Sequence, residues 1–488
     1  MIDKKSLAKI VGAGNVDSRS ATLEAYSKDF SFVSPVRPAC VVRPGNAGEI
    51  EKLVALARES KTPLVPVSSG APHFRGDTVP STGGSVIVDL SGMKKILRVD
   101  RKNRVAMFEP GVTFGELVPA VAAEGLRLNM PLMPRRTKSV VASLLEREPV
   151  AMPKYHWDIA DPLADVEIIL GSGVMFRTGA AAGPGNIEEQ WAAGGAQKEA
   201  AGPSSASWYR VIQGSQGTMG IVTWATARCE MIPRLEEPFL VGANSLEKIM
   251  EMVHWLVRLR LVNESFVLNA TDLATIMAKG KPEDYGKIKQ ALPPWALFYN
   301  VAGYDYFPED RVKGQVADMR GLAQKVGLEP VTSLGGVSAF DLLKAVQTPP
   351  GDFCWKQPGG WNCQEIFFLC PFQKVDDLIA TMYAAADEAG YPAPDMGVYV
   401  QPVVQAVNFH VEFDLFYQPE NRAGTDIVRK LSVDAVRKLM DRGAFFSRPY
   451  GEITAIVMNR DAATASALKK VKSILDPDNI MNPGKLCF

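Results

Sequence analysis

The sequence predicts an α+β protein with more than one domain, and three observations lead to this prediction. The chain has 488 residues, of which 47% are hydrophobic, and about 150 residues per domain suggests about three structural units. Residues 1–233 alternate strand-like runs with a helical stretch and Gly-rich loops. Residues 235–440 carry longer helical patterns with strands between them. The change after Pro233 predicts a second α+β domain.

The first part begins with an amphipathic stretch near Glu49 whose apolar residues recur at helical spacing, which predicts a helix. Short runs rich in Val and Ile follow it, and Gly-rich loops separate them. The helix buries Ile50, Leu53, Val54 and Ala57, and the predicted strands are 64–67, 86–89, 104–108, 166–170 and a strand beginning at Ile221.

The second part and the C-terminus contain both periodicities. Apolar residues at helical spacing predict helices around 312–322 and 378–385. Strand-like runs occur at 367–369 and 411–416, and a last helix over 463–475 stops before Pro477. Alternation on the second of these strands places four polar side chains on one face. These are Asn408, His410, Glu412 and Asp414.

Composition and motifs argue against several classes of protein. Lys+Arg and Asp+Glu are both 54, so we expect no nucleic acid partner. No apolar run is long enough for a membrane span or a signal peptide, and we expect a cytoplasmic location. The six Cys form no CxxC pair and the four His lack ligand spacing, so we expect no metal. The Rossmann G-x-G-x-x-G, the P-loop and H-E-x-x-H are absent as well.

Two loops have the composition of ligand-binding loops. Residues 68–77, SSGAPHFRGD, follow a strand, and small residues there let backbone N–H groups cradle a pyrophosphate. Residues 213–220, QGSQGTMG, carry glycines at every third position, which allows close approach of a flat ligand. Taken alone, a loop like the first is more often a plain turn, and the structural alternative for the second is a β-bulge or tight turn.

The order of three motifs resembles that of the FAD-linked oxidases. These are E-P-G-V-T at 109–113, G-S-Q-G-T-M-G-I-V-T at 214–223 and D-P-D-N-I-M-N-P-G-K at 476–485. The resemblance implies a two-subdomain FAD-binding fold of the p-cresol methylhydroxylase type with an α+β cap. It implies an FAD-binding domain at 1–233, a cap and substrate domain at 234–440, and a return to the FAD-binding domain at 441–488.

A finer resemblance points to the vanillyl-alcohol oxidase and p-cresol methylhydroxylase branch. Residues 145–147, L-E-R, and Asp158 are similar to a segment of that branch, and Arg448 falls where it has an arginine. This implies hydride transfer from a phenolic alcohol or 4-alkylphenol to flavin N5. The implied catalytic candidates are Asp158, Arg448, His410 and Tyr450. Their structural alternatives are a helix cap, a salt bridge, a buried histidine and a packing tyrosine.

The resemblance also implies a set of FAD contacts. The chain departs from the family because its phosphate loops, 68–72 and 137–143, have fewer glycines than usual. Hydroxyl groups and Lys138 would then supply phosphate contacts in place of backbone. The candidates are Ser68, Ser69, Gly70, Ala71, Pro72, His73, Thr137, Ser139, Ser143, His156, Gly214, Gly217, Gly220, Ile221 and Lys485.

Two other functions remain open at this point. A 2-hydroxy acid dehydrogenase is the second enzymatic reading, although the H-x-G-D-G-N-x-H motif of such relatives is absent. The altered phosphate loops favour a third reading, a structural or electron-relay subunit of a redox complex. Because the chain has no Cys cluster for electron relay, we expect a separate electron-acceptor protein or subunit, in a homo- or hetero-oligomer.

Overall fold

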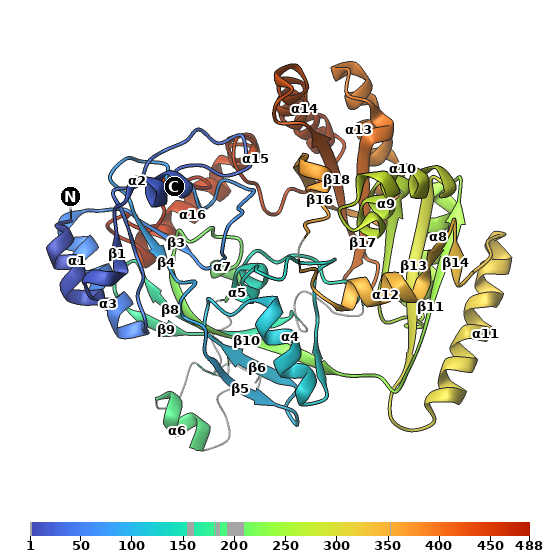
Figure 1. The fold of residues 1–488 in the computed structure, drawn as a ribbon, viewed down its shortest axis with the longest axis horizontal. Coiled ribbons are helices and arrows are strands. Elements are labelled where there is room, and N and C mark those ends of the chain that lie inside the picture. Colours follow the sequence, from blue (N-terminus) through green and yellow to red (C-terminus); the bar gives the residue numbers. More distant parts are fainter. Residues whose placement is uncertain (1, 154–160, 180, 182–185, 193–208, 352) are drawn as a thin grey trace.

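The computed structural model describes residues 2–153, 161–179, 181, 186–192, 209–351 and 353–488. It has two lobes (Figure 1). The first lobe contains two sheets from the N-terminal half together with the C-terminal helices. The second lobe is built on one large sheet from residues 235–417. The predicted α+β class is confirmed.

The first sheet of the N-terminal lobe has the strand order β1-β2-β4-β3. Strands β2, β4 and β3 are parallel, whereas β1 pairs with β2 in the antiparallel sense. Helix α3 buries the four apolar residues that its sequence pattern predicted. The elements are α1 (Lys4–Val11), β1 (Val16–Asp17), α2 (Ser20–Ala25), β2 (Cys40–Val42), α3 (Ala47–Ser60), β3 (Leu64–Val67) and β4 (Val86–Asp89).

The second sheet of this lobe is antiparallel, with the order β5-β6-β10-β8-β9 and β7 paired to β10. Helix α4 begins at the E-P-G-V-T motif, where Thr113 and Glu116 form a capping box. A Cβ on Gly111 would lie 2.6 Å from the Leu90 carbonyl oxygen, so this motif has a packing role. The elements are β5 (Ile96–Asp100), β6 (Val105–Phe108), α4 (Phe114–Ala123), β7 (Leu126–Leu128), α5 (Val140–Leu145), β8 (Leu163–Leu170), β9 (Met175–Arg177), α6 (Ile187–Ala192), α7 (Tyr209–Ile212) and β10 (Gly220–Met231).

The second lobe contains a six-stranded antiparallel sheet with the order β11-β13-β12-β17-β18-β16. A small β14–β15 ribbon lies beside it. The elements are β11 (Leu235–Ala243), α8 (Leu246–Arg258), β12 (Ser265–Asn269), α9 (Ala270–Ala278), α10 (Pro282–Ala291), β13 (Trp295–Gly303), α11 (Pro308–Val326), β14 (Ser333–Leu334), β15 (Val337–Ser338), α12 (Ala339–Gln347), β16 (Asn362–Pro371), α13 (Val375–Ala389), β17 (Met396–Val403), β18 (Asn408–Tyr417) and α14 (Arg422–Asp441).

The two faces of the second lobe's sheet have different surroundings. One face packs against α8, α11, α13 and α14, and it buries the odd-numbered residues of β18 from Phe409 to Leu415. The even-numbered residues of β18 therefore point to the opposite face, as the alternation predicted. Part of that face packs on α9, α12 and residues 132–133 and 151 of the N-terminal lobe. Buried polar side chains of β18 thus lie on the side that meets the first lobe.

The C-terminal segment packs on the first lobe. Helices α15 (Ile453–Met458) and α16 (Ala462–Leu475) precede it, and Met481 forms a parallel bridge with Leu64 of β3. The buried Asp476 carboxylate accepts hydrogen bonds from the backbone N–H of Ile480 and Met481, and pairs with Lys472. The division of the chain at residues 233 and 440 remains our proposal, which limited proteolysis tests.

No helix in the described part of the chain combines the length and apolar character needed to cross a bilayer. The six cysteines are free thiols. Helix α6 lies in a Gly-, Ala- and Pro-rich part of the sequence. Its Asn186 and Glu189 form reciprocal side-chain to backbone hydrogen bonds, which explains a helix start in a Gly- and Ala-rich segment.

Candidate active site

Two neighbouring cavities run from the end of β3 toward the second lobe. The smaller one has a volume of about 100 Å³ and lies between β3, α5 and the 214–217 loop. The larger one, about 180 Å³, extends to residues 354–356 and Glu365 of the second lobe. The two cavities share the lining residues Pro66, Ser68, Asp77, Ala142 and Glu146.

The β3 loop contributes only some of its predicted contacts to these cavities. Ser68 lines both, and Ser69 and His73 line the larger one. Burial lowers the pKa of His73, so this imidazole is neutral near pH 7. Gly70 and Ala71 are exposed. These two residues and Pro72 line neither cavity.

The phosphate loop predicted at 137–143 has a mainly structural arrangement. The Ser139 side chain caps α5 by accepting a hydrogen bond from Ala142 N–H, and it donates to the Pro110 carbonyl. Ser143 donates to the Glu148 carboxylate at 2.7 Å. Thr137 is exposed and lines neither cavity.

The glycine loop faces the smaller cavity, which Gly214, Gly217 and Gly220 all line. Gly214 has φ +72° and open space where a Cβ would stand. Gly217 has the same φ, and a Cβ there would lie 2.5 Å from Pro66 Cγ. A Cβ on Gly220 would lie 2.3 Å from the Ile169 carbonyl oxygen, so strand packing requires this glycine. Gly214 is therefore the member that leaves room for a ligand.

Two further predicted contacts lie in the packed part of the first lobe. Ile221 is fully buried in the core beside the first sheet. Lys485 is buried and donates from Nζ to the Gly76 carbonyl oxygen at 2.7 Å, which ties the C-terminus to the β3 loop. His156 and Asp158 lie outside the residues that the structure describes.

Arg448 and Tyr450 line a third cavity of about 50 Å³ beside the larger one. Arg448 is 5% exposed, and its Nη1 donates to the Glu146 carbonyl at 2.9 Å. Its guanidinium lies over the Phe367 ring at 4.5 Å, and its Nε is buried without a hydrogen-bond partner. No described carboxylate lies within ion-pair distance of Arg448, so its salt-bridge alternative does not apply to this part of the chain.

His410 is 1% exposed, and its Nε2 lies 3.1 Å from a Glu412 carboxylate oxygen. Burial lowers the pKa of His410 even though Glu412 opposes this shift. The ring packs near Phe367 and Tyr399. It lines neither of the two main cavities, so its contact with a ligand would have to pass through neighbouring side chains.

The walls of the larger cavity contain an ion-pair network that joins the lobes. Arg75 Nη1 lies 2.5 Å from Glu146 and 3.3 Å from Glu148, while its Nε lies 2.9 Å from Glu365 on β16. Lys138 pairs with the same Glu146 and Glu148 at 2.8 and 2.7 Å. Burial opposes ionisation of Glu148 and Glu365, yet the nearby cations hold both pKa values below the usual range.

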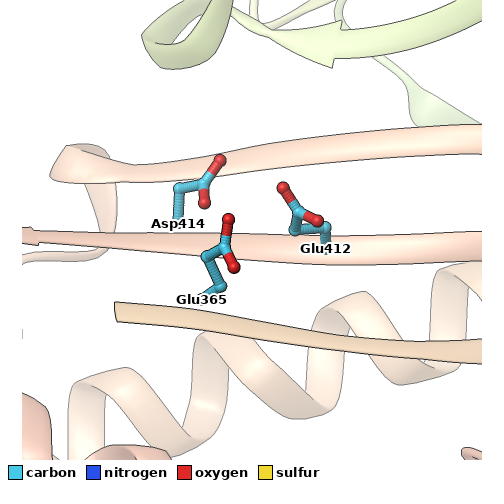
Figure 2. A group of neighbouring side chains, drawn as sticks. All are labelled: Glu365, Glu412 and Asp414. Carbon is cyan, nitrogen blue, oxygen red and sulfur yellow. The ribbon is translucent and has the colours of Figure 1, made fainter. Parts of the chain in front are cut away.

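On the second-lobe side, Lys356 lies among carboxylates. Its Nζ hydrogen-bonds to Glu365 and Glu412 and lies 3.7 Å from Asp414. Figure 2 shows these three acidic side chains converging from β16 and β18. Burial raises the pKa of Asp414 to about 7, and Lys356 opposes that shift.

Sequence reasoning did not single out Arg75, Arg135, Lys356 or Glu365, although all four line the larger cavity. Glu365 lies two residues before the predicted strand-like run at 367–369, and β16 (Asn362–Pro371) includes it. Arg75 lies inside the loop that was proposed for phosphate contact. Arg135 has a buried Nη1 without a hydrogen-bond partner, and its guanidinium lies 5.1 Å from the Phe74 ring.

The chain matches two models of protein families. Residues 38–179 match the FAD binding domain, and residues 451–486 match the C-terminal domain of FAD linked oxidases. Glycolate oxidase subunit GlcD of Bacillus subtilis (strain 168) is 23% identical over 99% of this chain and 96% of its own length. The 4-cresol dehydrogenase [hydroxylating] flavoprotein subunit of Pseudomonas putida is 26% identical over 52% of this chain and 47% of its own.

The fold is that of a known flavoprotein structure. A crystal structure of p-cresol methylhydroxylase with substrate bound superposes with a TM-score of 0.84 and 18% identity, covering 99% of this chain and 96% of that one. Fold and family matches together define an FAD-dependent oxidoreductase. The chain contains an FAD binding domain and the C-terminal domain of FAD linked oxidases, and it has the p-cresol methylhydroxylase type of fold, which confirms the resemblance seen in the motifs.

The cleft residues fit FAD as the cofactor. The smaller cavity has the open backbone position at Gly214 and the hydroxyl of Ser68. Arg135 and Arg448 carry buried guanidinium nitrogens without protein partners, the donors that a pyrophosphate or an anionic flavin would need. We assign Ser68, Ser69 and Gly214 to the cofactor wall as a proposal. FAD, when bound, supplies the hydride acceptor.

Proposed function

We propose that this chain oxidises a small phenolic alcohol or 4-alkylphenol. The observation that carries this proposal is the pairing of an aromatic and apolar wall with a buried arginine. Phe74, Leu132, Met133 and Trp355 line the larger cavity. Phe74 also lines the third cavity, and so does Arg448, whose Nε is buried without a hydrogen-bond partner among the described residues. A ring with one oxygen anion suits such a wall, because the ring buries apolar area and the oxygen meets a fixed cation.

The chain's own residues can orient such a substrate. Arg448 is permanently charged and can stabilise a phenolate through its free Nε. Glu365 is ionised and faces the larger cavity, so it accepts a hydrogen bond from a substrate hydroxyl. Lys356 is held protonated by its carboxylates despite burial, so it donates rather than accepts a proton. Tyr450 has a pKa raised by burial, and its hydroxyl stays protonated.

Asp158 remains the proposed base or cation-stabilising group beside the reacting carbon. Its test is the rate of flavin reduction by substrate under anaerobic conditions in Asp158→Asn, compared with wild type. A loss of tenfold or more is expected, because positioned acid–base groups contribute about 10²–10⁴-fold. An unchanged rate would remove Asp158 from the reaction.

A 2-hydroxy acid is the second candidate substrate, and two observations favour it. The match to glycolate oxidase subunit GlcD spans nearly the whole chain. Arg135 lines the larger cavity without an ion-pair partner among the described residues, and a guanidinium binds carboxylates in a bidentate way. This reading places the substrate carboxylate at Arg135 instead of a phenolate at Arg448.

One anaerobic experiment separates the two substrates. The purified yellow protein is mixed with 4-ethylphenol or vanillyl alcohol in one arm, and with glycolate or D-lactate in the other. Bleaching of the flavin band by the phenols only, with loss of bleaching in Arg448→Met, supports the leading proposal. Bleaching by the hydroxy acids only, lost in Arg135→Met, supports the second. Thr137→Ala is the matched control, because that side chain is exposed and outside both cavities.

We also propose that a separate protein accepts the electrons. Glycolate oxidase subunit GlcD and the 4-cresol dehydrogenase flavoprotein subunit are both named as subunits, and the described cysteines are single free thiols. Turnover with an artificial dye but not with oxygen would support this; rapid turnover with oxygen alone would oppose it. The proposed cytoplasmic location rests on the sequence, and cell fractionation tests it.

A further inference from the structure

The acidic side chains around Lys356 have the spacing of a cation site. One carboxylate oxygen from each of Glu365, Glu412 and Asp414 lies within 4.8 Å of the others. The strand register places Glu365 opposite Asp414, and Glu412 two residues away on the same face (Figure 2). Such all-oxygen sets, with oxygens converging on one centre, are what hard divalent cations such as Ca²⁺, Mg²⁺ and Mn²⁺ take.

A fourth acid lies beside this group. Asp272 of α9 is fully buried, and neither of its carboxylate oxygens has a hydrogen-bond partner among the residues that the structure describes. A Cβ on Gly397 would lie 1.9 Å from Asp272 Oδ1, and Gly397 is the cross-strand partner of Asp414. Asp414 is fully buried as well, and its Oδ2 also lacks a partner. Unpartnered buried oxygens at the edge of an acidic group indicate room for further cation ligation.

The centre of this group already holds a positive charge. Lys356 Nζ hydrogen-bonds to Glu365 and Glu412 and lies 3.7 Å from Asp414. Arg75 acts from outside this group by contacting Glu365, and the buried His410 ring contacts Glu412. An ammonium with three donors is the one side-chain group that can replace a compact ion among several carboxylates.

We infer that Lys356 is a built-in cation that takes the place of a divalent metal ion in the three-carboxylate cage of Glu365, Glu412 and Asp414, beside Asp272. The tethered charge keeps the cage occupied without a metal. It also fixes Glu365 in the wall of the larger cavity. The inference is independent of which substrate the chain oxidises, because it concerns the balance of charge inside the second lobe.

The test removes the ammonium and offers a metal in its place. Lys356→Ala holoprotein is titrated with MnCl₂, and NaCl at equal ionic strength replaces it in the control arm. The thermal unfolding midpoint is recorded at each step. The free Mn²⁺ signal in electron paramagnetic resonance is recorded as well. We expect Lys356→Ala to bind a single Mn²⁺ per chain and its midpoint to rise by several degrees, because ligands that bind only the folded state stabilise it.

Lys472→Ala is the matched control. Lys472 is also buried, but its ion-pair partner is Asp476 alone. We expect no Mn²⁺-specific rise of the unfolding midpoint in Lys472→Ala or in the wild type. A rise of the same size in all three proteins, or none in Lys356→Ala, would overturn the inference.

A second variant covers the case in which Lys356→Ala does not fold. Lys356→Ala combined with Asp272→Asn removes the buried fourth acid together with the lysine. Glu365, Glu412 and Asp414 remain, so Mn²⁺ should still raise the unfolding midpoint. If this protein is folded and binds no Mn²⁺, the three remaining acids do not form a cation cage and the inference is wrong.

Discussion

Arg75 is expected to make a large contribution to the stability of the junction between the two lobes. Its guanidinium is 15% exposed and contacts Glu146, Glu148 and Glu365 at 2.5, 3.3 and 2.9 Å. Removing one partner of a buried ion pair costs about 3–5 kcal/mol, because the remaining charge loses its compensation. Each carboxylate keeps a second cation, Lys138 or Lys356. We therefore expect Arg75→Met to lower the free energy of unfolding by about 3 kcal/mol, the low end of this range.

This free energy translates into a measurable shift of the unfolding midpoint. An unfolding entropy of about 2.1 cal/mol/K per residue gives about 1 kcal/mol/K for 488 residues, if the chain unfolds as a unit. Arg75→Met should then lower the midpoint by about 3 °C in differential scanning calorimetry of the holoprotein. Arg429→Met is the control, because Arg429 is 52% exposed and pairs only with Glu452. Surface pairs contribute about 0–1 kcal/mol.

The pH dependence provides an independent check of the same reasoning. The cations hold the pKa of Glu148 and Glu365 below the ordinary value of 4.5 in the folded chain. A carboxylate whose pKa is lower in the folded chain than in the unfolded chain stabilises the fold at pH values above the unfolded pKa. This stabilisation is lost as the pH falls through the folded pKa. The difference in midpoint between wild type and Arg75→Met should therefore shrink below about pH 4.5. The reasoning would be refuted if Arg75→Met lowered the unfolding midpoint at pH 7 no more than Arg429→Met does. A midpoint difference between wild type and Arg75→Met that grows as the pH falls would refute it as well.

Three further predictions concern the cleft. Arg448→Lys should slow anaerobic flavin reduction by phenols at least tenfold while the protein stays folded. The reason is that a lysine lacks the planar fork with which Arg448 reaches both Phe367 and the Glu146 carbonyl. An unchanged rate would oppose the proposed role of Arg448 in substrate binding. Gly217→Ala should destabilise the protein by about 2 kcal/mol in thermal unfolding, from its left-handed φ and the contact with Pro66. Gly214 has open space around the position of a Cβ, so Gly214→Ala should cost less stability than Gly217→Ala. It should raise the FAD dissociation constant in fluorescence titration of the apoprotein. Equal effects of the two substitutions on FAD binding would argue against Gly214 as part of the cofactor wall.

Local patterns in the sequence were sufficient for the α+β class and for single elements, whereas the two-subdomain FAD-binding fold was inferred from the order of the family motifs. The 2.0-residue alternation of β18 was detectable because every odd position from Phe409 to Leu415 packs on one helix layer. The helix over 47–60 was detectable because its four apolar residues form one buried stripe. These signals are local, and each element needs only its own residues to show them.

The candidate site was less predictable, because most of it is assembled across long sequence separations. Arg75 meets Glu365 from 290 residues away, and no spacing rule connects a loop residue of the first lobe with a strand residue of the second. Motif reasoning also mixed structural and functional positions. Ile221 and Gly220 lie in motifs of the family because strand packing needs them, whereas Gly214 leaves open space in the same loop.

Glu365 is the point at which the two lobes depend on each other. Its carboxylate accepts from Arg75, which lies in the first lobe's β3 loop, and from Lys356, which belongs to the second lobe's cage. Arg75 in turn shares Glu146 with Lys138, next to the helix that lines the cofactor cleft. A change at the cleft that pulls Arg75 away therefore leaves Glu365 to Lys356 alone and alters the charge balance around Glu412 and Asp414. We therefore expect occupancy of the cleft to change the charge state of Glu365, because a buried carboxylate cannot lose a cation without taking up a proton or another partner.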